Sequence, residues 1–405
     1  MSQETVDLNC IGWDVHIVSA ISFQENIRLA LLRNGVIRAV TRVLPFIISQ
    51  NTSIANRPLA ARCIVNASAF LNTRLEDLDG VPLVIEAIDS DVIPSLMKCE
   101  PLLPYADHAT ARDQPITLLG SVLARYTIYR SVLRPTLLSM DAVEASRMEL
   151  NLIKDGQLHQ AWIRLKEVVA ERRRLLGHDI ADGYHIQSCQ NHKCGRAGEI
   201  GSFKRCGGCL HTFYCSKACQ RDDWRDGKHH LYCNGVHRRY LRTDGQMAGL
   251  RQKDIRFLDQ VIIAELRKHT ARINAHHLKT NVVEFNFVGQ NVDTIFDSRR
   301  VKPAPFGIKC SCEKFAHEMW NRMIEKAKEA PEPLILARTY IPGGMSRKVL
   351  LRALPLRCVL EDVSRTYYRE DKNSLTFPSH LSLAYTCCGR NSLEKETTTG
   401  KKRLL

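Results

Sequence analysis

The apolar positions along the first 140 residues recur at helical spacing, and strict strand-like alternation begins only near residue 282. A first apolar run ends at Gly35 and a second begins at Val36, while a later run ends at Gly80 and the next begins at Val81. Apolar residues spaced three and four apart predict amphipathic helices, and a glycine after such a run predicts where the helix ends. The N-terminal third is therefore predicted to be helical.

The two Gly-Val junctions lie 45 residues apart. This interval fits the period of about 40–47 residues found in armadillo and HEAT helical repeats. A third apolar helical stretch, residues 116–138, has no such junction. Residues 1–140 thus resemble an armadillo-like array over two units, and an ordinary helical bundle is the alternative.

The rest of the chain predicts a helical connector, a short cysteine-rich segment and a small α/β domain. The connector covers residues 141–185, with one long helix or a helical pair up to residue 177. The α/β domain covers residues 240–388, and the polar, basic segment 389–405 is expected to be disordered. The elements expected in the α/β domain are helices at residues 254–272 and 313–328 and strands at 282–288, 334–340 and 349–354.

Length, hydrophobic content and the first residues of the chain indicate how many domains to expect and in which compartment the protein lies. A length of 405 residues predicts two or three domains, and 44% hydrophobic residues are enough for a sizeable core. The expected fold is mainly α with a small α+β part. The acidic, polar start of the chain argues against a secretory signal, and no apolar run reaches the roughly 18–20 residues of a membrane span. A cytoplasmic or nuclear location, with reduced thiols and no membrane partner, is therefore expected.

Seven of the 15 cysteines fall between residues 189 and 233 at metal-ligand spacing, together with a histidine. Such ligands close on zinc without strain, and four of them make a saturated tetrahedral site. Eight ligands therefore predict two structural zinc ions. The predicted ligands are Cys189 and Cys194, Cys206 and Cys209, Cys215 and Cys219, and His229 and Cys233.

Residues 186–236 resemble a MYND-type zinc finger. The string Phe213-Tyr214-Cys215-Ser216-Lys217-Ala218-Cys219-Gln220, then Asp223-Trp224 and Gly227, carries the resemblance together with the ligand order. The resemblance implies a cross-brace, in which the first and third ligand pairs bind one zinc and the second and fourth pairs bind the other. The chain departs from the commonest MYND pattern at two places. The spacer in the first ligand pair is four residues long, and there is one extra residue between Trp224 and His229, so that His230 is a rival ligand.

The resemblance also implies a docking site for short proline-containing peptides at Ser216, Gln220 and Trp224. An aromatic face suits proline rings because the polyproline helix is already formed before it binds. The alternative is structural: Trp224 would belong to the small core of the finger, and Gln220 would cap a turn. The sequence leaves both interpretations open.

Two other function classes are less well supported by the sequence. Saturated zinc has no position for water, and neither the methyl-donor motif of SET-type lysine methyltransferases nor a phosphate-binding glycine loop is present, so no enzyme is expected. The formal charge of +15 favours nucleic acid, but acidic residues dilute the basic face of the finger and aromatic content is only 7%. The preferred hypothesis is a zinc-binding adaptor that docks proline-containing peptides, with a role in transcriptional regulation implied by the resemblance alone.

Overall fold

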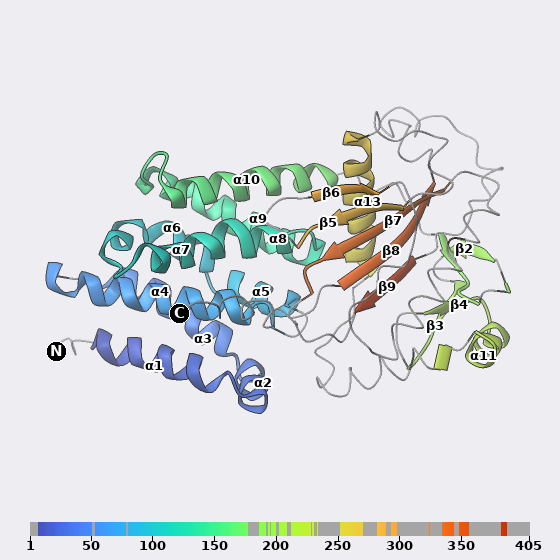
Figure 1. The fold of residues 1–405 in the computed structure, drawn as a ribbon, viewed down its shortest axis with the longest axis horizontal. Coiled ribbons are helices and arrows are strands. Elements are labelled where there is room, and N and C mark those ends of the chain that lie inside the picture. Colours follow the sequence, from blue (N-terminus) through green and yellow to red (C-terminus); the bar gives the residue numbers. More distant parts are fainter. Residues whose placement is uncertain are drawn as a thin grey trace, which may run out of the picture. The chain divides into compact units, whose positions relative to one another are not determined.

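The computed structural model divides the chain into two compact units, Met1–Gly177 and His178–Leu405 (Figure 1). The boundary falls inside the predicted connector of residues 141–185. The structure describes residues 7–50, 53–77, 80–176, 186–191, 193–194, 196–199, 202–208, 212–227, 229–230, 233, 252–269, 282–288, 293–297, 324, 334–343, 348–355 and 382–386.

The described part of the first unit is helical. Its α-helices are α1 (Leu8–Ile21), α2 (Glu25–Arg33), α3 (Val36–Ser49), α4 (Arg57–Arg74), α5 (Val81–Ile88), α6 (Val92–Lys98), α7 (Ala109–Thr117), α8 (Ala124–Tyr126), α9 (Arg130–Ala145) and α10 (Gln157–Leu176). Shorter 3-10 turns are η1 (Ile54–Asn56), η2 (Glu100–Tyr105) and η4 (Met148–Asn151), and η3 (Leu118–Leu123) is a π-helical segment.

These helices pack in two rows. In one row α4 lies between α1 and α7, and α7 with η3 contacts α10; in the other, α3 packs on α5 and α6, and both of these contact α9. The helices of the first row begin at residues 8, 57, 109 and 157, which is a period of about 50 residues. Such a two-layered array is compatible with helical repeats, although the armadillo-like family itself stays a prediction.

The backbone conformation explains why glycine occupies both of the Gly-Val junctions. Gly35 and Gly80 both adopt φ of +74°, and each directly precedes a helix, α3 and α5 respectively. This left-handed region is open to glycine and strained for other residues. At Gly80 space is a second requirement, because a Cβ atom would lie 2.1 Å from the hydroxyl oxygen of the buried Tyr126.

The apolar stretch of residues 116–138 is helical but interrupted. The π-helical segment η3 leads into α8, and the chain then turns over residues 127–129 before α9 begins. The hydroxyl of Thr127 donates to the carbonyl of Ala124 at 2.6 Å, and this bond closes the end of α8. Gly120 within η3 lets α10 approach closely, since a Cβ atom there would lie 2.8 Å from that of Ala161.

Among its described residues, the second unit holds the cysteine-rich segment, one long helix and a five-stranded mixed sheet. The sheet has the order β6-β5-β7-β8-β9, with β5 and β7 parallel and the other pairs antiparallel. Its elements are α13 (Gln252–Lys268), β5 (Val282–Asn286), β6 (Asp293–Asp297), β7 (Leu334–Ile341), β8 (Lys348–Pro355) and β9 (Ser382–Thr386).

The helix predicted at 254–272 is confirmed by α13 within four residues at each end, and the strands predicted at 282–288, 334–340 and 349–354 are confirmed by β5, β7 and β8 within two residues. Along the first strand, Val283, Phe285 and Phe287 are buried while Glu284 pairs across the sheet with Arg338. The predicted helix at 313–328 and the predicted disordered tail at 389–405 lie outside the described residues, apart from Ile324.

The mostly helical fold with a smaller strand part is confirmed. Within the described ranges, no helix is both long enough and apolar enough to cross a bilayer.

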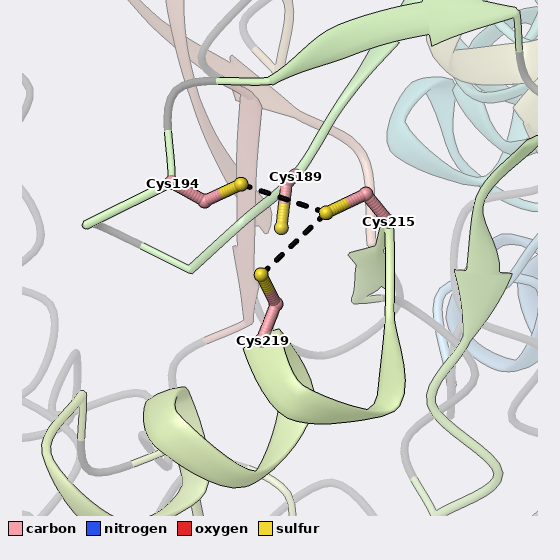
Figure 2. Close-up of side chains that lie close together, drawn as sticks. All are labelled: Cys189, Cys194, Cys215 and Cys219. Carbon is pink, nitrogen blue, oxygen red and sulfur yellow. Dashed lines mark hydrogen bonds between the residues drawn. The ribbon is translucent and has the colours of Figure 1, made fainter.

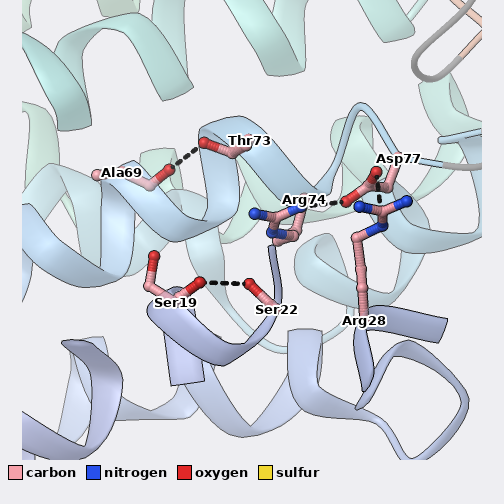
Figure 3. Close-up of polar contacts among 7 residues, drawn as sticks. All are labelled: Ser19, Ser22, Arg28, Ala69, Thr73, Arg74 and Asp77. Carbon is pink, nitrogen blue, oxygen red and sulfur yellow. Dashed lines mark hydrogen bonds and ion pairs between the residues drawn. The ribbon is translucent and has the colours of Figure 1, made fainter. Parts of the chain in front are cut away.

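A buried ion-pair cluster ties α2 to the end of α4 in the first unit (Figure 3). The carboxylate of Asp77 lies 3.3 Å from Nε of Arg28 and 2.9 Å from Nη1 of Arg74. Asp77 is only 2% exposed, and the Arg74 guanidinium also lies 5.6 Å from the centre of the Phe23 ring. Nearby, the hydroxyl of Ser22 donates to the carbonyl of Ser19 and closes the end of α1. One carboxylate therefore holds two guanidinium groups that come from separate helices.

Replacing Asp77 with asparagine should destabilise the helical unit. Removing one partner of a buried ion pair leaves uncompensated charge and typically costs about 3 kcal/mol. The matched control is Asp107→Asn, because Asp107 pairs with Arg62 at 3.3 Å while both side chains are about half exposed; that pair should contribute less than about 1 kcal/mol. Urea unfolding followed by circular dichroism at 222 nm measures both variants, and equal effects would show that the cluster has no special role.

Candidate metal centre

Four cysteines from two separate segments converge in the first cluster (Figure 2). The Sγ atoms of Cys189, Cys194, Cys215 and Cys219 all lie within 4.8 Å of one another. The Sγ of Cys215 lies 3.5 Å from those of Cys194 and Cys219, far beyond a disulfide bond of about 2.05 Å. In a tetrahedral site with Zn–S bonds of about 2.3 Å, neighbouring sulfurs lie about 3.8 Å apart. The donor set and its spacing therefore fit zinc.

Local hydrogen bonds shape the two loops that carry these cysteines. The backbone N–H of Cys194 donates to the carbonyl of Asn191 at 2.9 Å, and the N–H of Lys193 donates to the Asn191 side chain at 3.1 Å. This buried asparagine turns the four-residue spacer back on itself, so the departure from the commonest MYND spacing still brings both cysteines to one site. On the other side, Ser216 caps helix α11 (Lys217–Arg225) by accepting from the N–H of Cys219 at 3.1 Å.

The thiols of the first cluster differ in acidity. Burial raises the pKa of Cys189 to about 12, while a hydrogen bond from Ser216 lowers the pKa of Cys219 to about 7. Burial also raises the pKa of Cys215. Zinc binds the thiolate, so binding must release protons from the high-pKa thiols, and affinity must fall as the pH falls.

A second cluster consists of Cys206, His229 and Cys233, all of them buried. The Sγ atoms of Cys206 and Cys233 are 3.7 Å apart, and Nε2 of His229 lies 3.4 Å from Sγ of Cys206. These separations again match neighbouring ligands on one zinc, for which bonds of about 2.0 and 2.3 Å give about 3.5 Å between nitrogen and sulfur. Cys209, the fourth predicted ligand, lies outside the described residues and stays a prediction.

The structure favours His229 over its rival. His229 is 4% exposed and directs Nε2 at the cluster, and burial lowers its pKa, which favours the neutral imidazole that binds metal. His230 instead directs Nδ1 to the backbone carbonyl of Trp224 at 2.7 Å. With the extra residue before the histidines, it is still His229 that joins the cluster.

The two clusters alternate along the chain. The first takes its ligands from residues 189–194 and 215–219, and the second takes Cys206 from between these segments and His229 and Cys233 from beyond them. This is the interleaved arrangement that the MYND resemblance implies. Four protein ligands leave zinc no open position for water, so its chemistry at the first cluster is structural closure.

Several supporting residues could not be singled out from ligand spacing alone. The hydroxyl of Thr212 lies 3.5 Å from Nδ1 of His229, where it can fix the tautomer of the ring. The hydroxyl of Tyr214 donates to the buried carboxylate of Asp223 at 2.7 Å. A Cβ atom on Gly227 would meet that carboxylate at 1.8 Å, and one on Gly208 would lie 2.6 Å from Sγ of Cys233. In the sequence, only the glycines beside the ligands indicated that other side chains come this close to the backbone.

The three residues predicted to bind a peptide lie along one face of the finger. One side of helix α11 carries all three, because they are spaced four residues apart. Ser216 caps the start of the helix, and Gln220 and Trp224 lie within it. Trp224 is 38% exposed and lies outside the buried cluster of the finger, which gathers Phe203, Phe213 and Tyr214 around the cysteines. The indole is therefore not the core of the module, and Ser216 rather than Gln220 provides the cap.

Comparisons with known proteins agree with this geometry. Residues 189–233 match the family model of the MYND finger. A segment of 73 residues is 33% identical to Tudor domain-containing protein 1 of Homo sapiens, and it covers 18% of this chain and 6% of that protein. No solved structure matches the chain significantly. The chain therefore contains a MYND finger, which is a zinc-binding protein-interaction module, and its two Cys/His clusters fit two zinc sites.

Zinc content should distinguish the two histidines. The wild-type chain is expected to hold two zinc ions after dialysis against a chelator of intermediate strength. His229→Ala should hold one, because loss of a ligand weakens a site by at least the 10–100-fold seen for supporting residues. His230→Ala, the matched control, should still hold two. Elemental analysis of the dialysed proteins gives the count, and the reverse result would make His230 the ligand.

Proposed function

We propose that this protein is a non-enzymatic adaptor whose MYND finger docks short proline-containing peptides. The observation that carries the proposal is Trp224, a large aromatic side chain that stays 38% exposed on a rigid module. The proposal includes a role in transcriptional control, which is supported only by the resemblance to the MYND family.

The surroundings of Trp224 suit such a role. Its ring lies 5.8 Å from the ring of His229 and 5.9 Å from that of His230, centre to centre. His229 belongs in turn to the second cluster, so the indole lies against a residue that is predicted to bind zinc. A rigid aromatic platform favours a polyproline segment, because neither partner loses much conformational entropy on binding.

Gln220 completes the proposed groove. It lies one helical turn before Trp224 on the same face, and its side chain is partly exposed. An amide both donates and accepts hydrogen bonds, and a polyproline helix leaves its backbone carbonyls unbonded. Ser216, which is already engaged by the N–H of Cys219, contributes chiefly by fixing the helix that presents the other two residues.

The helical unit would supply the adaptor with a second surface. A stacked array of helices presents an extended face to partners. Because the unit has its own buried core, which includes Phe70, Tyr126 and Trp162, we expect it to fold without zinc.

Replacing Trp224 with alanine should weaken the binding of a fluorescein-labelled hexaproline peptide by about 30-fold or more, as for a central aromatic contact. The two zinc ions should remain bound, since Trp224 is no ligand. Trp13→Ala is the matched control: Trp13 is 61% exposed on α1 in the other unit. Fluorescence anisotropy and elemental analysis on the same samples check both points, and unchanged binding by the Trp224 variant would rule out the groove.

Nucleic acid is a second candidate partner, favoured by the distribution of charge. Residues 1–177 contain 19 lysines and arginines and 19 acidic residues, whereas residues 178–405 contain 39 and 24. The whole formal charge of +15 therefore belongs to the unit with the finger and the sheet. A basic unit attracts phosphate backbones through counterion release.

We expect this charge to produce only non-specific binding. The affinity for a 20-base-pair duplex should be independent of its sequence and should fall at least about tenfold between 50 and 200 mM salt. A salt titration by anisotropy with two unrelated duplexes tests this. Tight, sequence-dependent binding at 200 mM salt would instead favour nucleic acid as the partner.

A further inference from the structure

A second row of side chains on helix α11 runs beside the proposed peptide groove. Lys217, Arg221 and Arg225 are spaced four apart, and all three are exposed. Each follows Ser216, Gln220 or Trp224 by one residue, which places it about 100° further round the helix. The basic row therefore runs beside the three residues that are proposed to bind the peptide.

The acidic groups of this helix are already engaged. Asp222 lies 3.9 Å from Arg225, Asp226 lies 2.6 Å from Nζ of Lys193, and Asp223 accepts from the hydroxyl of Tyr214. Across the part of the chain that the structure describes, Lys217 and Arg221 have no ion pair. Two cations beside the groove are thus available to a ligand.

Placing these cations here costs the helix stability. Like charges four residues apart repel each other on a helix surface. Lys217 also occupies the first position of the helix, where the helix dipole disfavours a cation, and the first turn has no acidic residue. Residues that oppose local stability without a visible compensation inside the protein are typical of binding sites.

We propose that the peptide docked by the finger carries acidic residues beside its proline segment, which pair with Lys217 and Arg221. This proposal rests on the proposed function. Along the helix axis, Arg221 and Lys217 lie three and seven residues before Trp224, or about 4.5 and 10 Å. A polyproline helix rises about 3.1 Å per residue, so the acidic positions fall within about three residues of the proline that meets the indole.

Charge complementarity favours an acidic peptide over a nucleic acid at this surface. A nucleic-acid backbone has a negative charge at every nucleotide. Some of these phosphates would come close to Asp222, which lies within α11, and to Asp226, which lies at its end. A peptide can place one or two carboxylates opposite the free cations and leave the rest of its length neutral.

The test compares three labelled peptides, in which six prolines are flanked at both ends by two aspartates, two serines or two lysines. Flanks at both ends make the result independent of the direction in which the peptide binds. The proteins are the zinc-loaded full chain, the K217Q/R221Q variant, the Trp224→Ala variant and a control, Lys204→Gln, which removes another exposed lysine of the finger. Binding is measured by fluorescence anisotropy at 50 and 500 mM salt, with zinc content and circular dichroism confirming that each variant is folded.

The aspartate-flanked peptide should bind the wild type about 3- to 10-fold more tightly than the serine-flanked one at low salt, as for two exposed ion pairs. The preference should shrink at high salt and disappear in K217Q/R221Q, but persist in the lysine control. Equal binding of all three peptides, lost in Trp224→Ala, would overturn this inference and leave peptide docking intact. Failure of all three peptides to bind would overturn the proposed function together with this inference.

Discussion

The finger depends on one constraint: four donor atoms must converge at a fixed short distance on a single point, and this must happen twice. Ordinary packing tolerates small displacements, but zinc ligands do not. The close approaches within the finger follow from this requirement. Gly208 leaves room for Sγ of Cys233, Asn191 folds back the longer spacer, and Ser216 fixes the helix that carries Cys219.

The same constraint explains why a tryptophan can remain exposed. A module of this size that folded by apolar burial would need its largest side chain in the core. Here metal closure supplies most of the folding free energy, and Phe203, Phe213 and Tyr214 are sufficient to fill the interior around the cysteines. Trp224 can therefore stay at the surface of the finger, where the proposed peptide docking would use it. In the helical unit the opposite holds, since Trp162 is fully buried.

The features that the sequence could predict are those with short-range causes. Ligand pairs lie within five residues of each other, strands alternate with a period of two, and a glycine such as Gly35 or Gly80 marks a left-handed turn wherever it occurs. The family resemblance added the interleaving of the ligands. The features that the sequence could not predict depend on residues that are distant in the chain. Asp77 meets Arg28 across 49 residues, and Gly80 is required by Tyr126, 46 residues later.

The interleaving of the two clusters has a consequence for the time at which the finger can form during synthesis. Cys189 and Cys194 leave the ribosome early, but their partners Cys215 and Cys219 follow only after Cys206 has passed. Cys206 in turn waits for His229 and Cys233. The nascent chain thus exposes five thiols of the finger before Cys219 completes the first site, whereas the helical unit ahead of it can already have folded. Each zinc site can therefore close only after ligands of the other site have left the ribosome.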